Sequence, residues 1–430
     1  MSFAFLNLCD ELLKAVADEG YSEPTAIQIE AIPAVLSGRD VMAAAHTGTG
    51  KTASFTLPMV QRLSGGASDG VSDDQGDVVS PEALHVRALV ITPTRELAAQ
   101  VFQSVQNYSR HLKISSAAVF GGVRIEPQIA QLQAGLDVLV ATPGRLLDLY
   151  GQGAIKFDAL EILVLDEADR MLDMGFIDDI RRIQMLLPVK RQTLMFSATF
   201  SDAVKSLSKG MFNDPLLIEV AAANSTADTI KQVIHPVDKE RKSELLIDLI
   251  KRNKWHQVLV FSRTKKGADI LVSELEKASI RAESIHANRT QHARTHALDD
   301  FKKGKIVALV ATDIAARGID VSQLPCVVNF DLPYVAEDYV HRIGRTGRAG
   351  SFGLAVSLVS EDEYKQLKSI EQVIGIEFER KIIRGFMPTE KKPVSKFDDD
   401  EYGCFEPDAK SKPNGRRGAN SKKTKPRRRR

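Results

Sequence analysis

The stretch Ala45-His-Thr-Gly-Thr-Gly-Lys-Thr52 lies between an apolar run and a helical pattern in this chain of 430 residues. Glycines in such a turn let backbone N–H groups approach phosphates at the N-terminus of the following helix. Lys51 can then reach the β- and γ-phosphates of a nucleotide, and the Thr52 hydroxyl can hold Mg²⁺. Because Ala45 stands where the general pattern has Gly, a fortuitous glycine turn stays open as the alternative. The residues expected to surround the phosphates are Thr47, Gly48, Thr49, Gly50 and Lys51.

Apolar runs of the same kind recur along the chain and alternate with longer helical patterns. Continuous apolar strands separated by helices are typical of parallel sheets covered on both faces, which bind ligands at the carboxyl ends of their strands. The length suits two such α/β domains of about 200 residues each. The runs span residues 40–45, 88–92, 117–120, 138–141, 162–165 and 193–196 in the first half, and 258–261, 307–310, 327–330 and 354–358 in the second.

Shifts in composition mark the expected boundaries. We expect a first α/β domain over residues 1–220 and a second over 229–387, joined by a small, polar linker at 221–228. Residues 388–430 are rich in Lys, Pro and Gly with few apolar side chains, which predicts a disordered basic tail. A segment rich in Gly, Ser and Asp at 65–82 is expected to be a solvated loop of the first domain.

A second polar motif, Asp166-Glu-Ala-Asp169, also follows an apolar run. Asp166 at the end of a strand suits Mg²⁺ coordination, partly through water. Glu167 beside it can orient or deprotonate an attacking water molecule. A solvated acidic turn is the alternative, but its place downstream of a phosphate-binding turn favours chemistry. The two motifs together predict hydrolysis of a nucleoside triphosphate.

A third motif, His341-Arg-Ile-Gly-Arg-Thr-Gly-Arg348, lies far along the chain. If it were helical, Arg342, Arg345 and Arg348 would form a basic stripe at i, i+3 spacing. A guanidinium that meets the charge developing on a transferred phosphoryl group accelerates the reaction by about 10³ to 10⁵. A patch for a nucleic-acid backbone and a solvated helix face are the alternatives for the motif taken alone.

Charge is unevenly distributed along the chain. Of 58 Lys and Arg residues, eleven fall in residues 408–430 together with one of the 56 acidic residues, which leaves the rest with a net charge of −8. A basic tail on an acidic body suggests a polyanionic partner, although a tail that only aids solubility is the alternative. Three cysteines without CxxC spacing, no secretion signal and no apolar run of 18 residues indicate a reduced, cytoplasmic protein outside the membrane.

Together these motifs resemble the DEAD-box RNA helicases of superfamily 2 over residues 3–385. The resemblance predicts two tandem RecA-like (P-loop) domains, each a mainly parallel sheet with helices on both faces. The short basic tail is most similar to the bacterial RhlE-type subgroup. Further motifs in the order of the family are Gly20-Tyr-Ser-Glu-Pro-Thr-Ala-Ile-Gln28, Pro93-Thr-Arg-Glu-Leu97, Gly121-Gly122, Thr142-Pro-Gly-Arg145, Ser197-Ala-Thr199, Phe261-Ser-Arg263, Gln291-His-Ala-Arg294 and Arg317-Gly-Ile-Asp320.

The resemblance implies further residues of an ATP site. Gln28 would bond adenine through its amide, Tyr21 would stack on the base, and Asp320 would accept from the ribose hydroxyls. Arg345 and Arg348 would be arginine fingers supplied by the second domain. His341 would link the γ-phosphate site to Glu167. The pair Ser197 and Thr199 would couple hydrolysis to strand separation.

The resemblance also implies an RNA site of hydroxyls, backbone N–H groups and guanidiniums, which suit phosphate and 2′-OH groups rather than base edges. Duplex and single-stranded RNA are thus the expected partners, bound largely independently of sequence. A monomer that meets ribosome-assembly or RNA-decay proteins is expected. The RNA-facing residues would be Thr94, Arg95, Gly122, Thr142, Arg145, Gln291, Arg294 and Thr312.

The function implied is an RNA-stimulated ATPase with ATP and Mg²⁺ as cofactors. It would bind RNA and ATP between two domains and locally, non-processively unwind short duplexes or remodel RNA–protein complexes. An ATP-gated RNA clamp within a larger ribonucleoprotein is the alternative, because the same motifs serve both. A processive DNA helicase is a second alternative, against which the segment Tyr21–Gln28 and the Asp166–Asp169 tetrad argue.

Overall fold

The computed structural model describes residues 2–45, 49–65, 85–133, 135–220, 230–316, 321, 324–347 and 353–389. The expected linker at 221–228, nearly all of the loop at 65–82 and the tail beyond 389 lie outside the described residues, so those predictions stay predictions. The expected domain boundaries, 1–220 and 229–387, also stay predictions.

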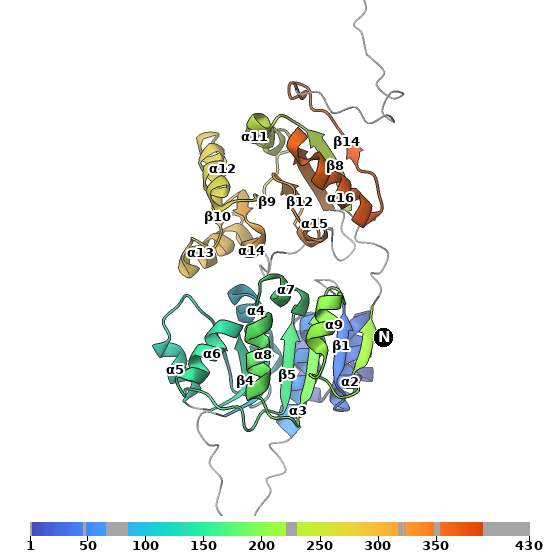
Figure 1. The fold of residues 1–430 in the computed structure, drawn as a ribbon, viewed down its shortest axis with the longest axis vertical. Helices are drawn as coiled ribbons and strands as arrows, with labels where there is room; N and C mark the ends of the chain where they lie inside the picture. Colours follow the sequence, from blue (N-terminus) through green and yellow to red (C-terminus); the bar gives the residue numbers. More distant parts are fainter. Residues whose placement is uncertain are drawn as a thin grey trace, which may run out of the picture. The chain divides into compact units, whose positions relative to one another are not determined.

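The first half forms a seven-stranded sheet with the strand order β3-β4-β2-β5-β6-β1-β7, in which every paired strand is parallel (Figure 1). Because the strands are parallel, the polar residues at their carboxyl ends lie at one edge of the sheet, where the reversal in strand order leaves a crevice. The strands are β1 (Val41–Ala44), β2 (Val86–Ile91), β3 (Ser116–Val119), β4 (Leu136–Ala141), β5 (Ile162–Asp166), β6 (Gln192–Ser197) and β7 (Leu216–Glu219).

Helices cover both faces of this sheet because alternate strand residues point to opposite sides. Val90 packs with the helices α1 to α4, whereas its neighbour Leu89 packs with those from α6 to α9. The strands therefore read as continuous apolar runs. The helices are α1 (Asp10–Asp18), α2 (Ala26–Leu36), α3 (Lys51–Gly65), α4 (Arg95–Tyr108), α5 (Glu126–Leu132), α6 (Pro143–Gly151), α7 (Ala168–Asp173), α8 (Ile177–Leu186) and α9 (Asp202–Ser208), preceded by the 3₁₀ helix η1 (Phe3–Leu6).

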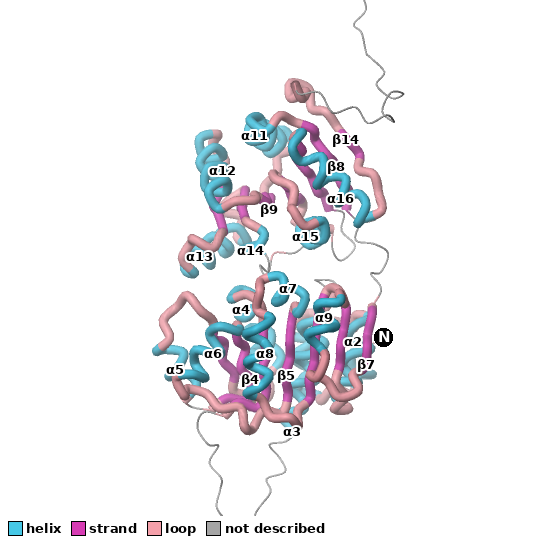
Figure 2. Tube along the Cα trace, viewed as in Figure 1, coloured by secondary structure: helices cyan, strands magenta, loops and turns pink. Residues whose placement is uncertain are grey.

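The second half repeats the architecture with the strand order β10-β11-β9-β12-β13-β8-β14, again with parallel pairing. Figure 2 shows its strands in magenta with helices in cyan beside them. The strands are β8 (Ile230–Pro236), β9 (Val258–Phe261), β10 (Ala282–Ile285), β11 (Ala308–Ala311), β12 (Cys326–Asn329), β13 (Gly353–Val359) and β14 (Glu379–Arg380).

The helices of the second half also lie on two faces. Leu246 and Leu271 of α11 and α12 share one core with Val260 of β9, while Phe301 of α13 shares another with the next strand residue, Phe261. The helices are α11 (Lys242–Arg252), α12 (Lys265–Lys277), α13 (Gln291–Lys302), α14 (Asp313–Ala316), α15 (Ala336–Ile343) and α16 (Tyr364–Ile374), with 3₁₀ turns η2 (Lys239–Arg241) and η3 (Glu361–Glu363).

The predicted fold class is thus confirmed: two mainly parallel sheets in tandem, each with helices on both faces. No helix within the described residues is long and apolar enough to cross a membrane.

Candidate active site

The phosphate-binding turn connects β1 to α3, and the described part of it begins at Thr49. Gly50 has a φ of +91°, and a Cβ there would lie 2.4 Å from the amide nitrogen of Gln28, so no other residue fits. Lys51 opens α3 with 7% of its surface exposed, and its buried Nζ has no hydrogen-bond partner among the described residues. A buried, unpaired ammonium is costly, and it fits an anion such as a nucleotide phosphate. Thr47 and Gly48 lie outside the described residues.

Asp166 ends β5 and is almost fully buried. Burial raises its pKa to about 7, because desolvation together with the Glu167 carboxylate outweighs the attraction of Lys51. A nearby cation would stabilise the ionised form of this buried carboxyl group. Thr52, at the first turn of α3, lines the same cavity as Asp166, so this pair of oxygen donors fits Mg²⁺.

Glu167 follows with its backbone in the left-handed region, at a φ of +54°. Burial alone would raise the pKa of its carboxyl. The charges of Arg170, Lys51 and Arg345 outweigh burial, so the pKa of Glu167 lies below its ordinary value. A carboxylate kept ionised in this way can accept a proton from water.

The last carboxylate of the tetrad joins this strand end to the next. Asp169 accepts a hydrogen bond from the backbone N–H of Ala198 at 3.0 Å, and its own N–H donates to the Ser197 hydroxyl oxygen at 3.3 Å. The Ser197 hydroxyl donates in turn to the carbonyl of Thr199 at 2.8 Å. These hydrogen bonds connect the two motifs directly, while the coupling role of Ser197 and Thr199 stays a prediction.

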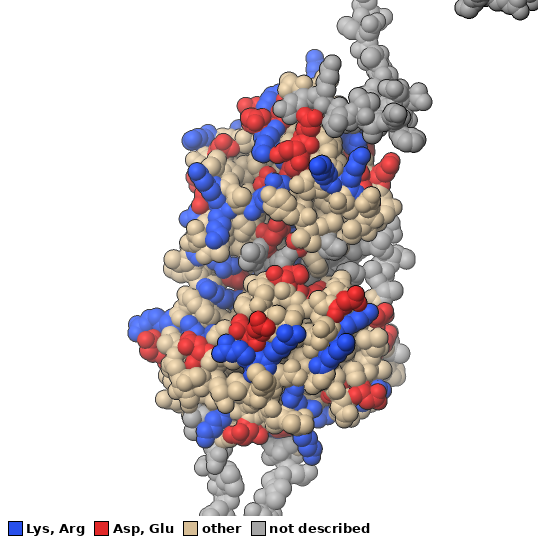
Figure 3. All heavy atoms as spheres, in the orientation of Figure 1, with Lys and Arg blue, Asp and Glu red and all other residues tan. Residues whose placement is uncertain are grey.

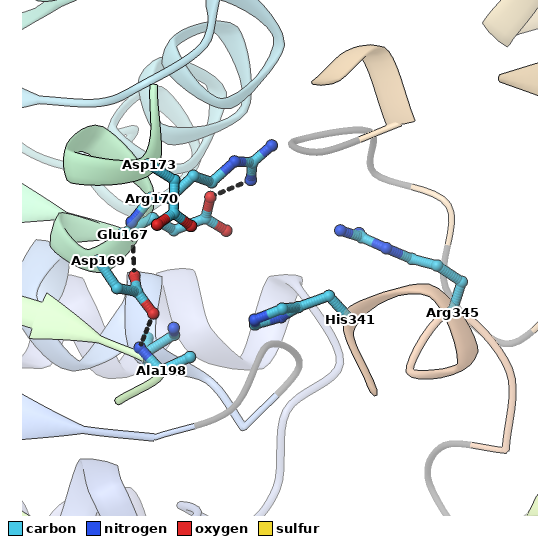
Figure 4. Close-up of a pocket in the computed structure, with 8 residues that line it drawn as sticks. Glu167, Asp169, Arg170, Asp173, Ala198, His341 and Arg345 are labelled. Atoms are coloured by element: carbon cyan, nitrogen blue, oxygen red, sulfur yellow. Dashed lines mark hydrogen bonds and ion pairs between the residues drawn. The ribbon is translucent and has the colours of Figure 1, made fainter. Parts of the chain in front are cut away.

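Residues from both halves of the chain line one small pocket. Figure 4 shows His341 and Arg345 pointing toward Glu167 and Asp169. The pocket also includes Lys51 and has an empty volume of about 400 Å³. Residues of the acidic tetrad and of the distant arginine motif thus line the same pocket, and the roles predicted for them stay predictions.

The expected basic stripe, however, is wrong as a helical face. Helix α15 ends at Ile343, so Arg345 lies beyond it. Arg342 is only 2% exposed and binds both oxygens of Asp313 and the Asn329 side chain. Its role is therefore structural. Arg348 lies outside the described residues.

The larger cavity beside this pocket measures about 810 Å³ and is lined by Tyr21, Gln28 and Thr52. Tyr21 is 54% exposed, which leaves its ring accessible. The Gln28 side chain accepts from the Thr25 N–H at 2.9 Å and donates to the Gly50 carbonyl at 3.2 Å. It therefore braces the phosphate turn and keeps one further donor and acceptor site for a base. Asp320, the expected ribose contact, lies outside the described residues.

The RNA-facing residues expected in the first half occur together at strand ends. Arg95 lies directly over Gly122, since a Cβ on this glycine would lie 1.9 Å from its guanidinium. Arg145 donates to the Val123 carbonyl at 3.0 Å. Thr94 and Thr142 are the N-cap residues of α4 and α6.

In the second half, Gln291 and Arg294 at the start of α13 both contact Glu96, at 3.0 and 2.9 Å. They line the larger cavity with Glu96, which the sequence interpretation passed over although it lies inside the motif Pro93–Leu97. Thr312 is buried and precedes α14. Their contacts with RNA stay predictions.

Comparisons with known proteins show the family to which this chain belongs. The family model for DEAD/DEAH box helicases matches residues 25–207, and the model for the helicase conserved C-terminal domain matches residues 241–350. The RNA helicase CrhR of Synechocystis sp. is 41% identical over 396 residues, which cover 92% of this chain and 77% of the relative. The ATP-dependent RNA helicase RhlB of Pseudomonas syringae pv. tomato is 40% identical over 379 residues, covering 87% and 92%.

Among solved structures, S. cerevisiae Dbp5 bound to RNA and ADP BeF3 has a TM-score of 0.77 and 33% identity, covering 89% of this chain and 95% of Dbp5. The predicted RhlE-type subgroup stays a prediction. The motifs, the paired parallel sheets and these relatives agree, and the chain belongs to the DEAD-box ATP-dependent RNA helicases.

Proposed function

We propose that this RNA helicase separates short RNA duplexes locally and non-processively. The observation that carries the proposal is the small pocket lined by Lys51 and Glu167 from the first half of the chain and by His341 and Arg345 from the second. Because the hydrolytic residues come from both halves, ATP turnover requires the halves to meet. Each ATP molecule then supports one cycle in which the two halves close and reopen, and each cycle separates base pairs at one place on the RNA.

The residues of the pocket divide the chemistry among them. Lys51 binds phosphate oxygens through its otherwise unpaired ammonium. Glu167 accepts a proton from the attacking water, and Arg345 offsets the charge that develops on the transferred phosphoryl group. Thr52 and Asp166 would hold Mg²⁺, which neutralises charge between the β- and γ-phosphates when bound.

RNA binding is proposed to depend on individual guanidinium and backbone N–H groups rather than on a broad positively charged surface. Lys and Arg are interspersed with Asp and Glu on the face seen in Figure 3, so no field of one sign covers it. The guanidiniums of Arg95 and Arg145 lie next to the backbone around Gly122 and Val123. Guanidinium and backbone N–H donors recognise phosphates without reading sequence.

The length of the groove sets the expected unwinding range. We expect ATP to align the RNA-facing residues of both halves into one groove that is a few nucleotides long. If this groove accepts only a bent single strand, the complementary strand of a bound duplex must dissociate. Each stacked step is worth about 1.4 kcal/mol on the DNA scale, so one closure offsets several steps and not dozens. Duplexes of about ten pairs should then separate readily, and those beyond about twenty hardly at all.

A strand-displacement series tests the proposal. Blunt and tailed duplexes of 8 to about 30 pairs are incubated with the full chain, ATP and a trap strand. The proposal predicts a steep fall in yield with length, with release of RNA only where ATP is hydrolysed. The Glu167→Gln variant should bind ATP and RNA but should neither hydrolyse ATP nor release the RNA for a second cycle. Efficient separation of the longest duplex in a single encounter would refute the proposal, while tight retention without any strand separation would favour the RNA-clamp alternative.

We propose RNA as the partner and Mg²⁺ as the metal on the same grounds. A cytoplasmic location, a monomeric state and contacts with ribosome-assembly or RNA-decay proteins stay predictions from the sequence.

A further inference from the structure

The pocket contains a residue to which neither the sequence motifs nor the proposed chemistry gave a role. Arg170 lies one helical turn after Glu167 on α7, and its side chain is 9% exposed. Its Nη1 donates a hydrogen bond to Oε2 of Glu167, whose side chain is 11% exposed. The contact is marked by a dashed line in Figure 4.

This ion pair differs from an ordinary structural one. The Nε and Nη2 atoms of Arg170 are buried without a hydrogen-bond partner among the described residues. Arg342, by contrast, directs its three nitrogens to Asp313, Asn329 and the Asp331 carbonyl. Among the described residues, Arg62, Arg145, Arg191, Arg263 and Arg294 each have one buried side-chain nitrogen without a hydrogen-bond partner, and Arg170 is the only arginine with two. Arg170 instead directs its one good contact to Glu167.

Glu167 in turn needs an external support for its side chain. A non-glycine residue in the left-handed region is held there by its surroundings. The backbone of Glu167 is held by its N–H bond to Asp166 at 3.0 Å. Its carboxylate receives the hydrogen bond from Arg170, which fixes Oε2 and leaves Oε1 as the oxygen that would accept a proton from an attacking water molecule.

We propose that Arg170 is a positioning residue for water activation, which holds the Glu167 carboxylate so that its second oxygen faces the pocket shared with His341 and Arg345. The inference rests on the proposed role of Glu167 as the base. It predicts that Arg170 affects the rate of hydrolysis through Glu167 and has little effect on how tightly ATP binds.

The test compares Arg170→Met and Arg170→Lys in the full chain by RNA-stimulated ATP hydrolysis. Arg170→Met should lower kcat by at least about tenfold with KM for ATP changed by less than about twofold, because misplacement of a reacting group by about 1 Å can cost up to about 10²-fold in rate. Arg170→Lys should recover part of that rate. Arg182→Met is the matched control, because Arg182 also faces an acid three residues away, Asp179, but is 65% exposed.

A double variant separates positioning from a general structural role. If Arg170 acts through Glu167, adding Arg170→Met to Glu167→Gln should not lower the residual kcat further. Equal changes in kcat and KM, or additive effects in the double variant, would overturn the inference. The double variant also keeps the test decisive if Arg170→Met alone fails to fold, since it leaves no buried carboxylate at 167 without its cation.

The same experiment distinguishes the positioning role of Arg170 from the proposed role of Glu167 as the base. Near-normal turnover by Glu167→Gln would refute the proposed base. An inactive Glu167→Gln together with a fully active Arg170→Met would refute the positioning role alone.

Discussion

A single methyl group added at Gly353 should lower ATP turnover by displacing Arg345, the proposed arginine finger, although the methyl group makes no contact with Arg345 itself. Gly353 begins β13, and a Cβ there would lie 2.3 Å from Oγ1 of Thr346 and 2.4 Å from the backbone N of Gly347. These residues follow Arg345 directly. Two hydrogen bonds hold residues 345–347 in place on the side away from Gly353. The Thr346 hydroxyl donates to the Leu324 carbonyl, and the Leu324 N–H donates to the carbonyl of Arg345 at 3.1 Å.

The size of the effect follows from these distances. Ordinary van der Waals contact for a Cβ begins near 3.4 Å, so the backbone at Gly347 must move by about 1 Å in Gly353→Ala. A shift of that size in a group that meets the transition state can cost about 10²-fold in rate. Overpacking of this kind also costs typically about 1–3 kcal/mol of stability.

The assay is RNA-stimulated ATP turnover at saturating ATP and RNA, with thermal unfolding to confirm that the variant is folded. Gly151→Ala is the matched control, because a Cβ at Gly151 meets nothing within 4 Å. The control should keep its rate, while the rate of Gly353→Ala should fall by about two orders of magnitude. A folded Gly353→Ala with turnover within about twofold of the parent would refute the reasoning that this loop positions the finger.

Two further predictions address charge. Because burial raises the pKa of Asp166 to about 7, the folded chain holds a proton that the unfolded chain releases near pH 4, so stability falls by up to about 4 kcal/mol as pH rises from about 4 to 7. Asp166→Asn should therefore melt higher than the parent at pH 8 without Mg²⁺ and ATP, and the stability difference should shrink to about 1 kcal/mol at pH 4.5; a lower melting temperature at pH 8 would contradict this. Deletion of residues 408–430 should weaken RNA binding and reduce its log–log salt slope by about 0.7 for each RNA phosphate that the tail neutralises, with turnover at saturating RNA unchanged. Identical affinity at two salt concentrations would favour the tail's solubility role.

The sequence was sufficient to predict most of the fold and the chemistry that depends on local spacing. Apolar runs followed by polar motifs predicted β1, β5 and β6 together with the residues at their ends, because strand, turn and helix start are encoded within a few residues. The strands β7, β8, β10 and β14 were not predicted. Leu217 and both residues of β14 are exposed, so β7 and β14 lack a continuous buried run. The runs of β8 and β10 contain polar residues, such as Lys231 and Gln232 in β8 and Glu283 in β10, that interrupt the apolar pattern.

What the sequence could not predict were contacts made in three dimensions. The spacing of Arg342 and Arg345 suggested one helical face, but Asp313 binds Arg342 in the core and the helix ends between the two arginines. Arg170 and Glu96 were passed over because each lies in or beside a motif whose other residues already had roles. Their partners, at the pocket and on α13, become visible only when distant segments meet.

The most direct test of the central claim, that the two halves share one hydrolytic site, is the turnover of Arg345→Ala in the full chain. Removing a guanidinium from the developing phosphoryl charge should lower RNA-stimulated kcat by at least about 10²-fold. ATP affinity should change little, since Lys51, Gln28 and Thr52 of the first half remain in place. Arg252→Ala, which removes a half-exposed arginine paired with Asp248, should behave like the parent. Near-normal turnover by Arg345→Ala would contradict the account and place the finger elsewhere.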